Sequence, residues 1–212
     1  MSLLAKEMGG GRDFEPLPEG VHIAVCYAVV DLGTHDDEYK GVHKDRHEIL
    51  IGWEVPAERI ELERDGQMVD LPRAISRRFT LSLSEKSNLR PFLQSWRGKA
   101  FTADELAGFD LAVLIGAPCQ LQVLHAVSKS NGKTYANISA IMPMPKGAAA
   151  PECENAPQYY SVDDHGAAIP ENIPDWMAEI IRSSYEYAEL AGTTTEDAAP
   201  DFTDADDESL PF

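Results

Sequence analysis

The stretch RAISRRFTLSLSEKSNLRPFLQSW, residues 73–96, changes its hydrophobic period halfway along. In its first half the apolar side chains occupy every second position: Phe79, Leu81 and Leu83. In its second half they recur at intervals of three or four residues: Leu89, Phe92, Leu93 and Trp96. Alternation is typical of a half-buried strand, and the longer interval is typical of an amphipathic helix. The stretch therefore predicts a strand that leads into a helix, with Ser84 as the helix cap.

Two strands are predicted upstream of this stretch. Residues 20–33, GVHIAVCYAVVDLG, place a set of apolar side chains on one face: Val21, Ile23, Val25, Tyr27 and Val29. Residues 47–55, HEILIGWEV, do the same with another set: Ile49, Ile51, Trp53 and Val55. The polar, charged segment THDDEYKGVHKDR, residues 34–46, is predicted to be a mobile loop between these strands. The Asp-Gly pair at residues 65–66 predicts a hairpin turn into the third strand.

Two further strands are predicted downstream of the helix. They are PCQLQVLHAV, residues 118–127, and TYANISAIM, residues 134–142, and the turn SKSNGK joins them. Before them, Thr102 and Glu105 have capping-box spacing and predict a short helical turn. Three strands, a helix and two strands form the layout of the OB-fold, a five-stranded, partly open barrel. The prediction is a mainly β, OB-fold body, and an open α+β sheet is the alternative.

The chain is predicted to have four parts. Residues 1–18 form a flexible N-terminal arm, and residues 19–146 form the OB-fold domain. Residues 147–191 form a Pro- and Ala-rich linker and a C-terminal helix, for which Pro174 and Gly192 are start and stop signals. One face of this helix is largely apolar and is expected to pack on the barrel or on a second subunit: Trp176, Met177, Ile180, Ile181 and Ser184. Residues 192–212 are predicted to be a disordered acidic tail.

The charge of the chain is unevenly distributed. The 212 residues carry a formal net charge of −18. Residues 1–146 hold 17 of the 18 basic residues and 20 of the 36 acidic ones, whereas residues 147–212 hold one basic and 16 acidic residues. The three cysteines are scattered, without a Cys-x-x-Cys pair, which fits a reducing compartment. No signal peptide or membrane-length apolar run is present in the sequence. We therefore expect a soluble protein, located in the cytoplasm, with a nearly neutral body that remains compatible with a polyanionic ligand.

An OB barrel binds oligonucleotides or oligosaccharides across its second and third strands and the adjoining loops. Single-stranded nucleic acid needs cations along its phosphates and flat side chains for base stacking. The candidate DNA-binding residues on this basis are Lys40, Lys44, Arg46, Trp53, Arg73, Arg77, Arg78, Lys129, Lys133 and Tyr135. Three acidic residues of the same region, Asp45, Glu48 and Glu54, reduce its positive charge.

Strand alternation predicts where some of these side chains point. Arg78 and Tyr135 face outward, whereas Arg77 falls on the inward face, which requires a place at the barrel rim or a bulge. Gly52 faces outward, where a missing side chain would let a ligand approach the backbone. Trp53 faces inward, and the sequence leaves it either as a core residue or as a stacking platform near the barrel mouth.

The sequence favours neither catalysis nor a metal centre. His35, Asp36, His43 and His47 lie in one segment, but His43 and His47 match no known ligand spacing. No nucleophile elbow, phosphate-binding glycine loop or carboxylate pair in a predicted cleft is found. We expect no bound metal, no cofactor and no enzymatic activity.

The last seven residues, DDESLPF at 206–212, combine acidic residues with a Leu-Pro-Phe ending. Behind an OB-like body, this ending resembles the C-terminal tip of bacterial single-stranded DNA-binding proteins, and similar tails occur in certain phage replication proteins. The residues of the match are Asp206, Asp207, Glu208, Leu210, Pro211 and Phe212. The body looks more like the phage-encoded members than like the shorter bacterial housekeeping protein.

The resemblance implies a function. It implies sequence-independent binding of single-stranded DNA in phage replication, recombination or repair, inside a bacterial host cell. The tip is expected to bind replication or recombination enzymes, with Phe212 in an apolar pocket of the partner and the acidic residues on a basic rim. A homodimer is possible, and no membrane partner is expected. The alternative is a protein–protein adaptor or decoy that uses such a tip without binding DNA.

Overall fold

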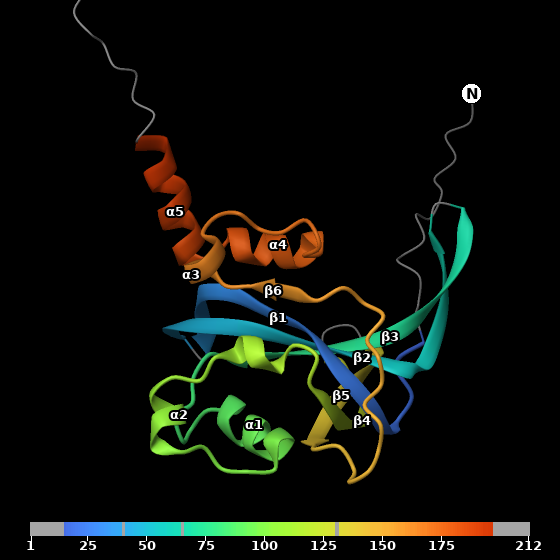
Figure 1. Cartoon of the computed structure of the whole chain (residues 1–212). Helices are drawn as coiled ribbons and strands as arrows, with labels where there is room; N and C mark the ends of the chain where they lie inside the picture. Colours follow the sequence, from blue (N-terminus) through green and yellow to red (C-terminus); the bar gives the residue numbers. More distant parts are fainter. Residues whose placement is uncertain (1–14, 40, 65, 130–131, 197–212) are drawn as a thin grey trace, which may run out of the picture.

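The computed structural model describes residues 15–39, 41–64, 66–129 and 132–196. Figure 1 shows a curled β-sheet with helices on two sides. The five main strands are antiparallel and lie in the order β3-β2-β1-β4-β5. Their bounds are β1 Gly20–Tyr39, β2 Val42–Arg64, β3 Gln67–Thr80, β4 Pro118–Val127 and β5 Thr134–Met142. This mainly β half-barrel is compatible with the predicted OB-like body.

The long segment between the first two strands is not the loop that the sequence predicts. β1 and β2 stay paired along it, from Gly33 opposite Glu48 to Tyr39 opposite Val42. Because the pairing continues, residues 34–39 and 42–46 form the two arms of a β-hairpin that extends beyond the sheet. The next connection follows the prediction, since β2 ends at Arg64 and β3 begins at Gln67.

A β-bulge in β1 shifts the predicted alternation. The pairing of β1 with β2 changes register between Cys26 and Ala28, so the side chains that face the first core are even-numbered before the bulge and odd-numbered after it. Ala24, Cys26 and Val29 lie in the core, whereas Val21, expected inside, is 57% exposed. In β2 the predicted inward set is confirmed, and all four members are buried: Ile49, Ile51, Trp53 and Val55.

The first hydrophobic core lies between the sheet and helix α1, Leu89–Arg97. All four apolar residues predicted for this helix are buried: Leu89, Phe92, Leu93 and Trp96. Ser84 is not the cap, because the helix begins after Asn88, and Ser87 Oγ accepts the N–H of Arg90 at 3.3 Å instead. Helix α2, Ala103–Ala107, has the predicted capping box between Thr102 and Glu105. A 3-10 turn, η1 Leu111–Leu114, leads into β4.

A second core covers the opposite face of β1 and β2 (Figure 1). It contains residues of strand β6, Gln158–Tyr160, which pairs in parallel with β1, and of helix α4, Asp175–Arg182. The short helix α3, Val162–His165, follows β6 and has no buried residue. Met177 and Ile181 of α4 are buried against Val30 and Leu50, so this helix packs on the sheet of its own chain. Trp176, predicted on the packed face, is instead 46% exposed.

The C-terminal helix differs from its prediction in two ways. The chain breaks at residues 183–184 into two helices, α4 and α5 Tyr185–Glu196. Gly192 does not end the helix, and residues 192–196, assigned to the disordered tail, lie within α5. The rest of the tail, residues 197–212, and residues 1–14 of the arm lie outside the described residues.

Candidate functional site

Two surface grooves lie along β3 and the segment that follows it. Groove 1 has a volume of about 440 Å³ and is bounded by the base of the β1–β2 hairpin, the end of β3 and residues 81–88. Five basic residues line it: Lys44, Arg46, Arg77, Arg78 and Lys86. Four of them were predicted from the sequence. Lys86 was missed, although its position shortly after the third strand could have indicated it. Two carboxylates, Asp45 and Glu48, also line the groove.

Ion pairs lower the positive charge available in groove 1. Arg46 Nη2 lies 2.6 Å from Asp37 Oδ2, and Arg46 Nη1 lies 3.9 Å from Glu48 Oε1. The other oxygen of Glu48 lies 4.0 Å from Arg78 Nη1. These pairs are partly exposed, so each one stabilises the fold only weakly and can be exchanged for a ligand anion. Lys44 and Lys86 are exposed on the groove surface.

Arg77 has a structural role at the floor of this groove. It lies on the inward face of β3, as alternation predicts, and its guanidinium stands 5.0 Å from the ring centre of Phe79 and 5.3 Å from that of Phe92. Its Nη1 donates to the carbonyl oxygen of Ile138 on β5 at 3.2 Å. β3 and β5 are the two ends of the sheet order, so Arg77 bridges the open seam of the half-barrel.

Groove 2 is the larger of the two, with a volume of about 690 Å³. β3 residues 71–76 form one wall, and residues 134–136 of β5 form another. Arg73 and Tyr135, both predicted DNA contacts, line this groove, and Tyr135 is exposed. Arg73 donates to the carbonyl oxygens of Arg59 at 3.2 Å and Glu15 at 2.5 Å, so part of its guanidinium is occupied by the backbone.

The structure corrects two of the predicted ligand contacts. Trp53 is 0% exposed and packs against Phe92 and Trp96, with ring centres 5.7 Å apart in both pairs. It is therefore a core residue and offers no face to a base. The space above Gly52 is filled rather than open, because a Cβ there would lie 3.0 Å from Ala28 Cβ and 3.4 Å from the Tyr27 ring.

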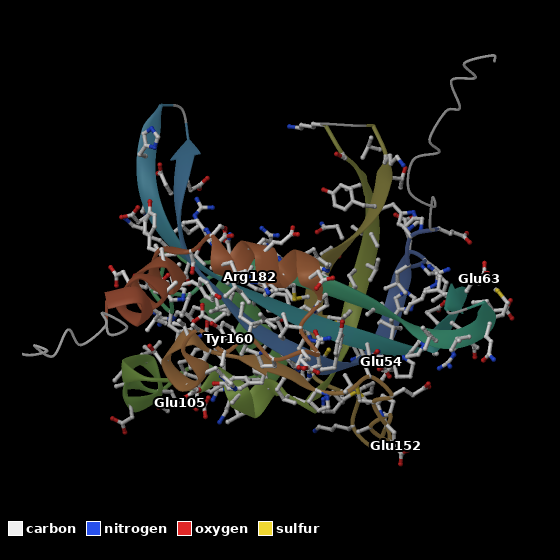
Figure 2. The ribbon with its side chains drawn as sticks, turned by 90° about the horizontal axis from the view of Figure 1, so that it is seen from above. Glu54, Glu63, Glu105, Glu152, Tyr160 and Arg182 are labelled. Atoms are coloured by element: carbon white, nitrogen blue, oxygen red, sulfur yellow. The ribbon has the colours of Figure 1, made fainter. Side chains whose placement is uncertain are left out.

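Two of the remaining predicted DNA-binding lysines lie on a hairpin that projects from the sheet. Figure 2 shows the β1–β2 and β4–β5 hairpins rising from the same side of the sheet. Lys129 and Lys133 lie at the end of the β4–β5 hairpin, are exposed and line neither groove. Lys40 and the tip residues lie outside the described residues: Asp206, Asp207, Glu208, Leu210, Pro211 and Phe212.

A carboxylate that the sequence placed among the candidate DNA-binding cations is instead buried, and it anchors the segment leading to β6. Glu54, on the face of β2 opposite Trp53, is 0% exposed (labelled in Figure 2). It accepts the backbone N–H groups of Glu154 at 2.9 Å and Asn155 at 2.7 Å, and the thiol of Cys153 at 3.4 Å. Burial opposes ionisation, but these donors hold the pKa of Glu54 below its ordinary value. Segment 153–155 is thereby fixed beside groove 2, which Asn155 lines.

A histidine in the wall of groove 1 connects the β1–β2 hairpin to α5. His47 Nε2 lies 2.7 Å from Asp31 Oδ1, and its Nδ1 lies 3.6 Å from Glu186 Oε1. Glu186 also accepts the N–H of Thr34 at 2.7 Å and its hydroxyl at 2.5 Å. At Gly33, with φ +81°, a Cβ would lie 2.3 Å from Ser184 Cβ, so glycine permits this close approach.

This connection predicts a pH dependence. The hydrogen bond to Asp31 raises the pKa of His47 above its ordinary value. A higher pKa in the folded state means that protonated His47 stabilises the fold. This contribution is fully present below the unfolded-state pKa of about 6.5, and it disappears as pH rises through the folded-state pKa. The Tm of His47→Gln should therefore fall below that of the natural protein by about 3 °C at pH 6, and by much less at pH 8.5. An equal difference at both pH values, measured by thermal unfolding, would show that the imidazolium charge contributes nothing.

Comparisons with protein-family models, with curated proteins and with solved structures found no match to the chain. In the part of the chain that the structure describes, no helix has the length and hydropathy needed to cross a membrane. Among these same residues, no three or more His, Cys, Asp or Glu side chains are grouped to hold a metal ion. Any function for the two grooves therefore has to be argued from their own chemistry.

Proposed function

We propose that the protein binds single-stranded DNA through an OB-like barrel, without sequence preference and without catalysis. The observation that carries the proposal is the arrangement of the two grooves along one strand. Residues 71–84 contribute to both grooves, with cations gathered in groove 1 and an exposed tyrosine beside an arginine in groove 2. A single strand that follows β3 would meet charge neutralisation and base stacking in succession.

The two grooves would contribute different terms to binding. In groove 1, Lys44, Arg78 and Lys86 would contact phosphates, and each neutralised phosphate adds a salt-dependent term to the affinity. In groove 2, a base stacked on Tyr135 would contribute about 1–3 kcal/mol. In an OB-like barrel, the two projecting hairpins would take the place of the loops that frame the ligand face.

The C-terminal tip would bind a partner enzyme of DNA replication, recombination or repair. This part of the proposal rests on the resemblance of residues 206–212 to the tips of single-stranded DNA-binding proteins. The protein would then act in the cytoplasm of a bacterial cell infected by the phage that encodes it. The competing proposal is an adaptor that uses such a tip without binding DNA. Because both proposals expect the tip to bind a partner, only DNA binding by the body distinguishes them.

The discriminating experiment compares single-stranded with duplex DNA. Labelled oligo-dT should bind in an anisotropy titration, and unlabelled oligo-dT should compete far better than a duplex of equal length, because a duplex hides its bases. The log–log slope of affinity against salt should be about −0.7 per phosphate contacted. If oligo-dT does not bind, or if affinity does not respond to salt, the adaptor proposal is favoured.

A further inference from the structure

Three buried side-chain atoms lack a hydrogen-bond partner within the described residues: Trp53 Nε1, Arg97 Nη1 and Gln158 Oε1. Trp53 is enclosed in the core, and Arg97 stacks on Phe101 and Phe109 outside both grooves. Gln158 is different because it lines groove 2. A buried acceptor without a donor destabilises a folded protein, so its presence in a ligand-sized groove calls for an explanation.

The backbone of Gln158 is held from two directions. In β6 it pairs with Ala28 of β1, next to the bulge that carries Tyr27. The preceding segment is fixed by the hydrogen bonds from Glu154 and Asn155 to the buried Glu54. Gln158 is therefore positioned by the fold, and it is one of the residues that line groove 2 together with Tyr135 and Arg73, although its side-chain oxygen is enclosed.

The surroundings of this amide define the chemistry of a ligand. Groove 2 offers an aromatic side chain, Tyr135, apolar walls that include Leu71 and Ile75, and the partly occupied guanidinium of Arg73. The orphaned oxygen requires an N–H donor. A flat ring that carries N–H donors on its edge and is linked to a phosphate satisfies all four features, and a nucleotide in a single strand is such a ligand.

We propose that the Gln158 side chain rotates to present its oxygen, enclosed in the free protein, to groove 2, where it accepts a hydrogen bond from the Watson–Crick edge of a bound base. The inference rests on the proposed function, because it assumes that single-stranded DNA enters this groove. Each of the four bases carries at least one N–H on that edge, so the contact favours an unpaired base over a paired one without selecting a sequence. Gln158 would thus read single-strandedness directly, since base pairing occupies the donor that it needs.

The test uses the full chain and two oligonucleotides that differ only in this donor. Thymine presents N3–H, and N3-methylthymine does not, while the phosphates are identical. The natural protein should bind the methylated oligonucleotide about fivefold more weakly, the size of one net hydrogen bond. Gln158→Met should bind both with the same, weaker affinity. Gln94→Met, on α1 and outside both grooves, is the matched control and should behave as the natural protein does.

Thermal unfolding separates this role from a structural one. Because the Gln158 oxygen has no partner within the described residues, Gln158→Met should keep or raise the Tm while it weakens binding. The inference is overturned if methylation of thymine N3 lowers the affinity of Gln158→Met as much as that of the natural protein, or lowers the affinity of neither. Binding of oligo-dT with no response to methylation would remove the role of Gln158 alone, whereas absence of oligo-dT binding would remove the proposed function as well.

Discussion

Reversing two charges in groove 1 should weaken the binding of oligo-dT about 100-fold, because two phosphate contacts are lost and two repulsions are introduced. The variant is Arg78→Glu with Lys86→Glu, and both residues line the groove from outside the core. Arg78 has a side chain that is 47% exposed and only a 4.0 Å contact with Glu48, so the fold should tolerate its replacement. The salt slope should become less steep by about 1.4, which corresponds to two phosphates. Anisotropy titrations at several salt concentrations measure both quantities.

The matched control changes the net charge equally at a distance from the grooves. Lys99 and Lys146 line neither groove, and Lys99→Glu with Lys146→Glu should change affinity only a few-fold through long-range repulsion. Equal losses in the two double variants would mean that affinity follows total charge, and groove 1 would then lose its assigned role.

Replacing Trp53 should affect stability strongly and DNA binding hardly at all. Trp53→Ala removes a fully buried ring from the contact with Phe92 and Trp96, and such truncations cost about 3–5 kcal/mol. For a chain of this size the Tm should fall by roughly 10 °C or more. Differential scanning calorimetry gives the stability change directly.

A milder variant keeps the DNA-binding question answerable. Trp53→Phe should retain the fold at a cost of about 1–3 kcal/mol and bind oligo-dT within twofold of the natural protein. Tyr135→Ala is the comparison, because it removes an exposed ring from groove 2 and should weaken binding while the Tm stays nearly constant. A large loss of affinity in Trp53→Phe would indicate that Trp53 stacks on a base, contrary to its burial in the core.

Local patterns in the sequence predicted most of the sheet and its first helix. The switch of period within residues 73–96 gave β3 and α1, and the Asp-Gly pair gave the β2–β3 turn, because each depends on neighbouring residues. The phase of β1 could not be predicted, since a single bulge near Tyr27 reverses which side chains face the core. The β1–β2 hairpin was missed because its residues are polar, and backbone pairing rather than burial holds it together.

The candidate site was predictable in composition but not in detail. Basic residues on β3 and its neighbours were expected, and four of them meet in groove 1. Sequence did not show that Arg77 bridges the seam to β5, because that contact joins residues 61 positions apart. Nor did it show the burial of Glu54, which depends on donors about 100 residues away. Long-range hydrogen bonds of this kind leave no periodic signal.

The roles proposed for both grooves depend most directly on whether the described body binds single-stranded DNA. The measurement is an anisotropy titration of labelled oligo-dT, at two salt concentrations, with the full chain and with a form that ends after Glu196. This end point keeps α5 whole and removes residues 197–212, which carry six acidic residues and no basic one. We predict that both forms bind in a salt-sensitive manner and that the shorter form binds more tightly, because an anionic competitor has been removed. If neither form binds, the grooves along β3 are not a DNA site.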